Sequence, residues 1–408
     1  NEFLFPCAPP LYDDPIVVVE GHGAWVRDSE GREFLDLFSG ILTTSVGHCH
    51  PEVVERAHQQ LRTLGHTSTL YMTEARVEVA RRLAELAPGR LRRSFFTNSG
   101  TEAVETAVTA ARLYTGRSEV IGLRYAYSGR SILACNLSAL APWRPLPTSI
   151  PGITHALSPY PYRCPFKQPC DDTCVEAFAR DLVEVIETTT SGRPAAFLAE
   201  TIQGAGGYIV PPPGYFQLTA EIIRSYGGVF ICDEVQSGMG LTGTMWAFQQ
   251  LGMTPDIVAF GKKTQVCGIM CTERIDNVPD NVFHVSSRIN STWGGNLVDM
   301  VRSARYLQII DEENLVEHAA TTGAMFLEEL QSVAAEFPQL SNVRGRGLML
   351  AFDMPDMATR DALRTALWDL GLASLACGDL SIRFRPCLTF TQDDVHRAIA
   401  LLREGLAG

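Results

Sequence analysis

Short apolar runs recur through the middle of the chain, and each one ends in polar residues. Residues 195–199, 229–232 and 257–260 are four or five residues long and rich in β-branched, aromatic or small apolar side chains. Runs this short predict strands that are buried on both faces. Longer segments with apolar residues at helical spacing lie between them. This alternation predicts an α/β fold around a mostly parallel central sheet.

The predicted strands bring polar groups to one edge of that sheet. Glu200 follows the first strand, Asp233 follows the second, and Lys262 and Lys263 follow the third after Gly261. Open α/β folds bind ligands at the carboxyl ends of their strands. Most lysine pairs are solvated. A desolvated lysine here, however, can lose its proton and form a Schiff base with an aldehyde. A nearby aspartate suits pyridoxal phosphate, because its carboxylate keeps the pyridine nitrogen protonated.

The remaining pattern predicts further helices and strands. Pro51 suits the first turn of a helix, and Asn98 is an N-cap candidate for a helix that runs to about Tyr114 and stops at Gly116. Other helices are predicted at 74–87, 175–187, 215–226, 297–311, 315–336, 359–370 and after Thr391. Other strands are predicted at 16–19, 23–26, 94–97, 119–123, 348–352 and 381–386.

Composition narrows the function classes. The 408 residues are 46% hydrophobic and 20% charged, as expected of a globular enzyme with roughly two to three domains. The net charge of −12 argues against nucleic-acid binding, and no apolar run approaches the ~20 residues of a membrane span. Most of the eleven cysteines are scattered, which favours a reducing cytoplasm. Three lie in one proline-rich loop, but their spacing poorly matches zinc or iron–sulfur sites, so no metal is predicted: Cys164, Cys170 and Cys174.

Three motifs in the expected order resemble the class III aminotransferases. These motifs are Asp233-Glu234-Val235-Gln236, the stretch 98–103 and the stretch 291–296. The family comprises pyridoxal-phosphate enzymes of the ornithine, 4-aminobutyrate and alanine–glyoxylate group, and the similarity runs from about Pro15 to the C-terminus. Residues 258–271 and the region around Arg383 look most like L-lysine 6-aminotransferase and 4-aminobutyrate aminotransferase. Residues 40–246 look more like the alanine–glyoxylate group.

The resemblance implies the fold type I architecture of pyridoxal-phosphate-dependent transferases. A large cofactor-binding domain would span residues 47–296. Residues 297–408 would form a smaller α+β domain, joined by the N-terminal segment 1–46. His48 and His50 fall in a stretch that the family uses as a structural turn, so we do not expect them to bind a metal.

The resemblance also assigns roles around the cofactor. Lys263 would be the Schiff-base lysine and general base, because Cys267 and Gly268 stand where the family has two glycines. Lys262 would then be a solvated neighbour. The motif that contains the aspartate would supply three contacts to the ring: Asp233 to the pyridine nitrogen, Val235 behind the ring and Gln236 to the phenolic oxygen.

The phosphate and the open ring face would be held by other segments. Ser99, Gly100 and Thr101 open a helix whose free amides and dipole suit a phosphate. Tyr127 would stack on the pyridine, with Ser128 beside it where the family usually has histidine. Thr292 resembles a threonine that reaches the phosphate of the other subunit. The protein would therefore be a homodimer with a shared active site.

Two arginines are expected to bind substrate carboxylates. Arg130 and Arg383 stand where family members hold such groups. In members that handle both ω-amines and α-amino acids, the second arginine rests on a glutamate, and Ala205 occupies that glutamate's position here. We therefore expect Arg383 to face the pocket as an unpaired cation.

These features predict a transaminase. It would move an amino group from an amino acid or ω-amino compound to a 2-oxo acid such as pyruvate, glyoxylate or 2-oxoglutarate. An alternative on the same scaffold is a lyase that performs β- or γ-elimination, or a decarboxylase, because the same lysine and aspartate serve all of these reactions. A non-catalytic binding protein is a third class, disfavoured because Lys263 and Asp233 are both present.

Overall fold

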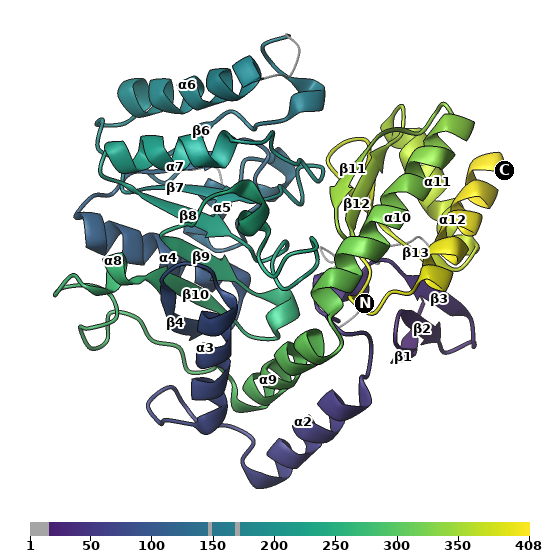
Figure 1. The fold of residues 1–408 in the computed structure, drawn as a ribbon, viewed down its shortest axis with the longest axis horizontal. Coiled ribbons are helices and arrows are strands. Elements are labelled where there is room, and N and C mark those ends of the chain that lie inside the picture. The colour runs from purple at the N-terminus through teal and green to yellow at the C-terminus, as the bar shows by residue number, and fades with distance from the viewer. Residues whose placement is uncertain (1–15, 146–148, 168–171) are drawn as a thin grey trace.

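The computed structural model describes residues 16–145, 149–167 and 172–408, and its core is a seven-stranded sheet with helices on both faces (Figure 1). Five neighbouring strands are parallel, and β10 runs antiparallel to both of its neighbours. The spatial order is β4 (Leu91–Thr97), β10 (Cys267–Thr272), β9 (Ile257–Phe260), β8 (Val229–Asp233), β7 (Ala196–Glu200), β5 (Val120–Leu123) and β6 (Ile153–Ala156).

Buried apolar side chains explain why the central strands form. Every residue of β7, β8 and β9 is buried, as the short unbroken apolar runs predict. The helices that cover this sheet are α4 (Gly100–Thr115), α5 (Ile132–Leu137), α6 (Asp172–Thr189), α7 (Tyr215–Ser225) and α8 (Glu273–Asp276). In register, Glu200 pairs with Asp233 and Asp233 pairs with Ala259. The carboxyl ends of the three strands therefore meet, as expected from the sequence.

Two smaller sheets lie beside the central one (Figure 1). The N-terminal strands β1 (Val18–His22), β2 (Trp25–Asp28) and β3 (Glu33–Asp36) are completed by β13 (Leu372–Ala373), which is parallel to β3. The other sheet has the order β11 (Ser341–Arg346), β12 (Met349–Asp353), β15 (Ser381–Phe384) and β14 (Leu375–Cys377). The chain's N-terminal segment and its C-terminal part therefore share a sheet.

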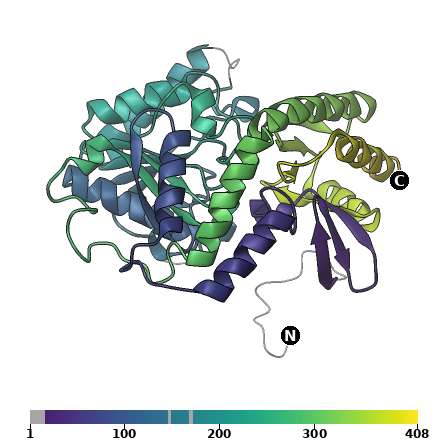
Figure 2. The same ribbon diagram turned by 60° about the horizontal axis from the view of Figure 1, so that its bottom comes forward.

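Helices connect and cover these layers. In Figure 2, α2 (Pro51–Thr63) and α9 (Leu297–Glu312) lie side by side, and α9 also packs against α3 (Glu74–Leu86). A short α1 (Ser39–Leu42) precedes them. The C-terminal part carries α10 (Leu315–Glu336), α11 (Met357–Asp369) and α12 (Gln392–Ala407). None of the helices in the described ranges is long and apolar enough to cross a membrane.

Two details differ from the sequence-based expectation. The N-cap of α4 is Ser99 rather than Asn98, because Ser99 is extended and its Oγ accepts from the Glu102 amide at 3.3 Å. The Asn98 amide instead donates to the Glu102 carboxylate at 3.0 Å. Residues 267–272 form a strand that was not predicted, and this strand joins β4 to β9. His48 Nε2 lies 2.7 Å from the Asp36 carboxylate, within hydrogen-bond distance.

Candidate active site

A cavity of about 240 Å³ opens at the carboxyl ends of β7 and β8, beside the start of α4. It gathers most of the residues that the sequence assigned to the cofactor, and its lining comes from five separate segments of the chain. Its lining residues are Ser99, Gly100, Thr101, Tyr127, Ser128, Gly129, Arg130, Glu200, Asp233, Val235, Gln236 and Lys262. The predicted residues therefore line one contiguous space, except that Lys262 takes the place predicted for Lys263.

Two buried carboxyl groups form one wall of this cavity. Burial raises the pKa of Asp233 to about 6, against the opposing effects of the Val235 amide and Lys262. Burial, and secondly the charge of Asp233, raise the pKa of Glu200 to about 8. The carboxylate of Glu200 accepts from the Tyr127 amide and the Gly204 amide, each at 2.9 Å. We call Glu200 and Asp233 the acid edge, since together they favour a cation or a shared proton.

The structure puts Lys262, not Lys263, in the cavity. Lys262 lines it and is close enough to Asp233 for their charges to interact. Lys263 is 2% exposed and donates from Nζ to the Gln236 carbonyl at 2.6 Å. The two lysines begin a short 3-10 helix, residues Lys262–Thr264, so their side chains leave the backbone in different directions. The expected position of Lys263 at the cofactor, and of Lys262 as a solvated neighbour, is thus corrected.

The local backbone explains this exchange. Gly261 is extended at the end of β9, and Lys262 then takes a left-handed φ of 54°. This kink, uncommon outside glycine, turns its side chain toward the cavity. Desolvation lowers the pKa of Lys262, so its amine is more readily neutral than that of an exposed lysine. The sequence did contain a signal for this assignment: Lys262 directly follows Gly261 and is therefore the first side chain after the strand that ends at Phe260.

The start of α4 offers an anion site, and the loop around Gly129 packs closely against it. Ser99 caps the helix, and Thr101 Oγ1 accepts from the backbone amides of Arg130 and Ser131, each at 3.2 Å. Gly129 has a φ of 132°, and a Cβ there would overlap the Thr101 hydroxyl. Only glycine therefore lets the loop after β5 approach the helix so closely. Backbone amides and a helix N-terminus suit a phosphate.

An aromatic and a cationic side chain, Tyr127 and Arg130, also line the cavity. The Tyr127 ring lies edge-on to Trp143, with centroids 5.3 Å apart. The exposed guanidinium of Arg130 sits 5.8 Å from the same Trp143 ring. Ser128, at the place where the family usually has histidine, is buried, and its amide donates to Ser138 Oγ at 2.9 Å. Here the serine belongs to the fold of the loop.

The turn after β8 positions two further predicted residues. The Val235 amide donates to Asp233 Oδ1 at 3.0 Å, which fixes the carboxylate. Val235 packs against the backbone of Gly100 at the start of α4, and the Gln236 side chain packs on Gly204. Both residues line the cavity as expected.

Arg383 does not face the cavity as the sequence predicted, although in the described ranges no carboxylate forms an ion pair with it. It is 9% exposed, donates weakly from Nη1 to the Gly204 carbonyl at 3.4 Å, and lies 5.6 Å from the centre of the Tyr208 ring. Arg385, two residues on, is fully buried and donates to Gln236 Oε1 at 3.3 Å. Sequence reasoning missed both Tyr208 and Arg385, because neither belongs to the motifs that carried the resemblance.

Thr292 lies away from this cavity. It is exposed and does not line the cavity, so its predicted contact with the phosphate depends on a second subunit.

The cysteine loop lies outside the cavity as well. The Sγ atoms of Cys164 and Cys174 are 3.6 Å apart, while Cys170 lies outside the described residues. Among the residues that the structure describes, no group of three His, Cys, Asp or Glu side chains could hold a metal.

The chemistry of the cavity fits pyridoxal phosphate. Asp233 suits a protonated ring nitrogen, the amides at the start of α4 suit the phosphate, and the Lys262 amine suits the aldehyde. A side chain at position 129 would collide with Thr101, so the loop that closes on the start of α4 requires glycine there. The residues present therefore fit this cofactor.

Comparison with known proteins agrees with this fit. The sequence profile described as Aminotransferase class-III matches residues 9–406. An L-lysine-epsilon aminotransferase of Mycobacterium tuberculosis is 37% identical over 94% of this chain and 90% of its own length. Alanine–glyoxylate aminotransferase 2 homolog 2, mitochondrial, of Arabidopsis thaliana is 34% identical over 97% and 83%.

Solved structures give the same result. The lysine aminotransferase of M. tuberculosis, in its internal aldimine form, superposes with a TM-score of 0.91 at 35% identity and covers 100% of this chain and 97% of its own. An (S)-enantioselective omega-transaminase from Thermomicrobium roseum gives a TM-score of 0.90 at 33% identity, with coverage of 98% and 95%. These comparisons give no support to the lyase alternative. The chain belongs to the class III aminotransferases, pyridoxal-phosphate-dependent enzymes of fold type I that transfer an amino group to a 2-oxo acid.

Proposed function

We propose that this transaminase works through Lys262, with a donor that carries a carboxylate distant from its reacting amino group. The observation that carries the proposal is that Lys262 and Asp233 share one cavity with the start of α4. A lysine that is desolvated beside a carboxylate is suited both to covalent attachment and to proton transfer. The buried Lys263 is instead a positioning residue, because its Nζ supports the turn at Gln236.

Each residue of the cavity then has a defined task. When bound, the cofactor supplies an electron-accepting ring that stabilises negative charge at the substrate carbon. Asp233 would hold a proton at the ring nitrogen, while Ser99, Gly100 and Thr101 would hold the phosphate. Lys262 would accept the proton released by the substrate carbon and so act as the general base and acid of the reaction.

The faces and edge of the ring would be held by residues on either side of the cavity. Tyr127 would cover one face of the ring and exclude water, and Val235 would close the other face. Gln236 would donate to the phenolic oxygen.

The substrate proposal rests on two arginines at different depths. Arg130 is exposed at the cavity wall, and Arg383 is buried near Glu200. A diamino acid or ω-amino acid could place its remote carboxylate on Arg130 and its amino group near Lys262. A 2-oxo acid, whose carboxylate adjoins the reacting carbon, needs a cation closer to Lys262, and Arg383 is the candidate. The named activity of the mycobacterial relative, an L-lysine-epsilon aminotransferase, supports this class of donor.

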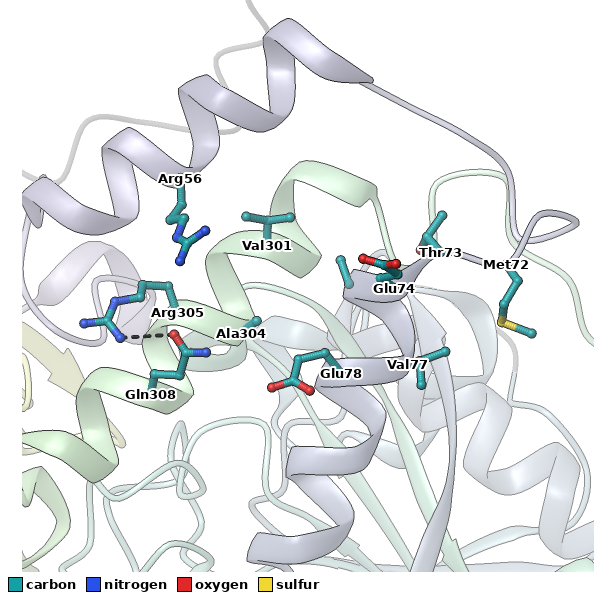
Figure 3. A pocket seen from close by; sticks show the side chains of 11 residues that line it. Arg56, Met72, Thr73, Glu74, Val77, Glu78, Val301, Ala304, Arg305 and Gln308 are labelled. Atoms are coloured by element: carbon teal, nitrogen blue, oxygen red, sulfur yellow. Dashed lines mark hydrogen bonds between the residues drawn. The ribbon is translucent and has the colours of Figure 1, made fainter.

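We further propose a homodimer with a shared site. A groove of about 630 Å³ runs between α2, α3 and α9, and Figure 3 shows Arg56 of α2, Glu78 of α3 and Arg305 of α9 along it. The loop beside it exposes large apolar side chains, with Leu70 85%, Tyr71 68% and Met72 80% exposed. A second copy of the chain would cover them and bring its own Thr292 to the phosphate. The mass in solution tests this, because a monomeric active enzyme would refute it.

A cytoplasmic location also remains a proposal. It is supported by the scatter of most cysteines through buried apolar segments, as at Cys135, Cys232 and Cys271. Such usage is typical of a reducing compartment. Fractionation of the cells that produce the protein would test it, and recovery outside the cytoplasm would refute it.

The lysine assignment can be tested by chemical trapping. Borohydride reduction of the cofactor-loaded enzyme, followed by digestion and mass spectrometry, should find the cofactor on Lys262. Recovery on Lys263 would overturn the assignment. In a portion of the cofactor-loaded enzyme that has not been reduced, L-lysine or 4-aminobutyrate alone should convert the cofactor to its amino form, and a 2-oxo acid should restore it. Release of ammonia or CO₂ in place of that exchange would refute transamination.

A further inference from the structure

The end of β15 holds two buried cations that have no acidic partner. Arg383 and Arg385 are 9% and 0% exposed, and in the described ranges neither has a carboxylate at ion-pair distance. The Nε of each guanidinium, and Nη2 of Arg385, also lack a hydrogen-bond partner among the described residues. Burying a charge without a counter-charge is costly. Something other than an ion pair must therefore hold Arg383 in this position.

Tyr208 is the residue that holds it. The Arg383 guanidinium lies 5.6 Å from the centre of the Tyr208 ring, within the range of a cation–π contact. Tyr208 is fully buried, and its backbone has a φ of 53°, which is rare for an aromatic residue. Its ring thus occupies a position that the backbone adopts only at a cost, as is common where a side chain serves function.

The loop that carries Tyr208 is fixed on both sides. Its ends pair through Gln203 and Ile209, with both backbone bonds at 3.1 Å. From the C-terminal part, the Gly378 amide donates to the Ala205 carbonyl at 2.9 Å, and Arg344 Nε donates to the Gly207 carbonyl at 2.9 Å. Tyr208 therefore has little freedom to move when a substrate enters. The Arg383 side chain is held only by a long hydrogen bond and the ring contact, so it is freer to move.

We propose that Tyr208 is a specificity-determining residue that gives Arg383 a neutral resting place where Ala205 cannot. The ring face and the Gly204 carbonyl hold the guanidinium aside while an ω-amino donor occupies the cavity. They hold it more weakly than a carboxylate would, because a ring offers only a quadrupole. A 2-oxo acid can then draw Arg383 out to its carboxylate at small cost. This inference rests on the proposed role of Arg383.

The test compares two substrates in three variants. In Tyr208→Leu, Arg383 loses its resting place. The KM for the 2-oxo acid should fall about threefold, and the KM for the ω-amino donor should rise about threefold. Tyr208→Phe keeps the ring and should leave both constants near their original values. The matched control is Tyr215→Leu, which removes an equally buried tyrosine away from the arginines and should not shift the two constants in opposite directions.

Three further variants distinguish an error in the role of Tyr208 from an error in the proposed role of Arg383. Ala205→Glu supplies an acidic partner, so it should raise the KM for the 2-oxo acid about tenfold, and adding Tyr208→Leu should change it little further. If Arg383→Ala leaves this KM unchanged, the carboxylate is bound elsewhere and the proposed function of Arg383 is wrong. If Arg383→Ala raises it but Tyr208→Leu moves both constants together or neither, the role of Tyr208 alone is overturned.

Discussion

The two poles of the active site are built in opposite ways. At the acid edge, Glu200 and Asp233 end adjacent parallel strands, and their positions follow from strand register alone. At the other pole, Arg383 and Arg385 are held by aromatic rings and carbonyl or amide oxygens from segments far away in sequence. The acid edge has a fixed geometry and its pKa values are shifted by burial. The arginine pole is held by weak contacts instead, and burial lowers the pKa of Arg385 to about 10.

This difference suggests a division of labour. Groups fixed by a sheet suit a cofactor that remains bound through every turnover. Cations held by weak, neutral contacts suit substrates that alternate, since an amino donor and a 2-oxo acid enter the same cavity in turn. Changes at the acid edge should therefore affect all substrates alike, whereas changes near the arginines should discriminate between them.

The largest effect is expected from the lysines that follow β9. Lys262→Ala removes the group proposed to exchange protons with the substrate carbon, so kcat should fall by about 10⁴-fold for every donor. Lys263→Met removes only the support of the Gln236 turn and should cost far less, on the order of tenfold. Steady-state kinetics on both purified variants decide this. A more severe loss in Lys263→Met would reverse the assignment.

A smaller, equally uniform effect is expected at Asp233. Asp233→Ala leaves the ring nitrogen without its carboxylate, so kcat should fall roughly 10²- to 10³-fold because the unprotonated ring accepts electrons poorly. The cofactor should stay bound through the phosphate contacts at α4, which an absorbance spectrum can verify. Losses in kcat that differ strongly between donors would contradict the expectation that changes at the acid edge affect all substrates alike.

The same contrast separates what the sequence could predict from what it could not. Residues 315–336 were predicted as a helix with the bounds that α10 has, and Thr391 caps α12 as expected, because periodicity and capping are local. The strand ends that carry Glu200 and Asp233 were also predictable. The choice between Lys262 and Lys263 was not, since it depends on one left-handed residue after Gly261.

Contacts over long sequence separations were out of reach for a different reason. The bond from Arg383 to the Gly204 carbonyl joins positions 179 residues apart, and the absence of a glutamate at position 205 predicted only that a partner was missing. Nothing in the local pattern indicates that Tyr208 would supply a ring instead. The antiparallel strand β10 was also missed. Cys267 and Gly268 were interpreted only as the counterparts of two family glycines, so the apolar residues that follow them were not considered as a strand.

The smallest effect should appear in the pH dependence of stability, to which the acid edge contributes together with the neighbouring Glu234, whose pKa burial raises to about 7. In the cofactor-free protein, Glu200 has a pKa raised to about 8 and Asp233 to about 6. A carboxyl whose pKa is raised on folding stabilises fully below its unfolded pKa and loses that contribution as pH rises through the folded value. Nearby Lys262 and Arg383 reduce this loss without abolishing it. The free energy of unfolding should therefore fall by roughly 1–3 kcal/mol between pH 5 and pH 8.

Urea titrations of the cofactor-free protein across this range can measure that decline. Glu200→Gln should flatten it, because the amide is neutral at every pH and can still accept from the Tyr127 amide. Glu336→Gln, at an exposed ion pair with Arg403, is the matched control and should leave the slope unchanged. Loading the cofactor should also flatten the decline, since a protonated ring nitrogen favours the ionised form of Asp233. A slope that rises with pH, or one that Glu200→Gln leaves intact, would mean that this carboxyl is already ionised in the folded protein and that burial does not control the acid edge.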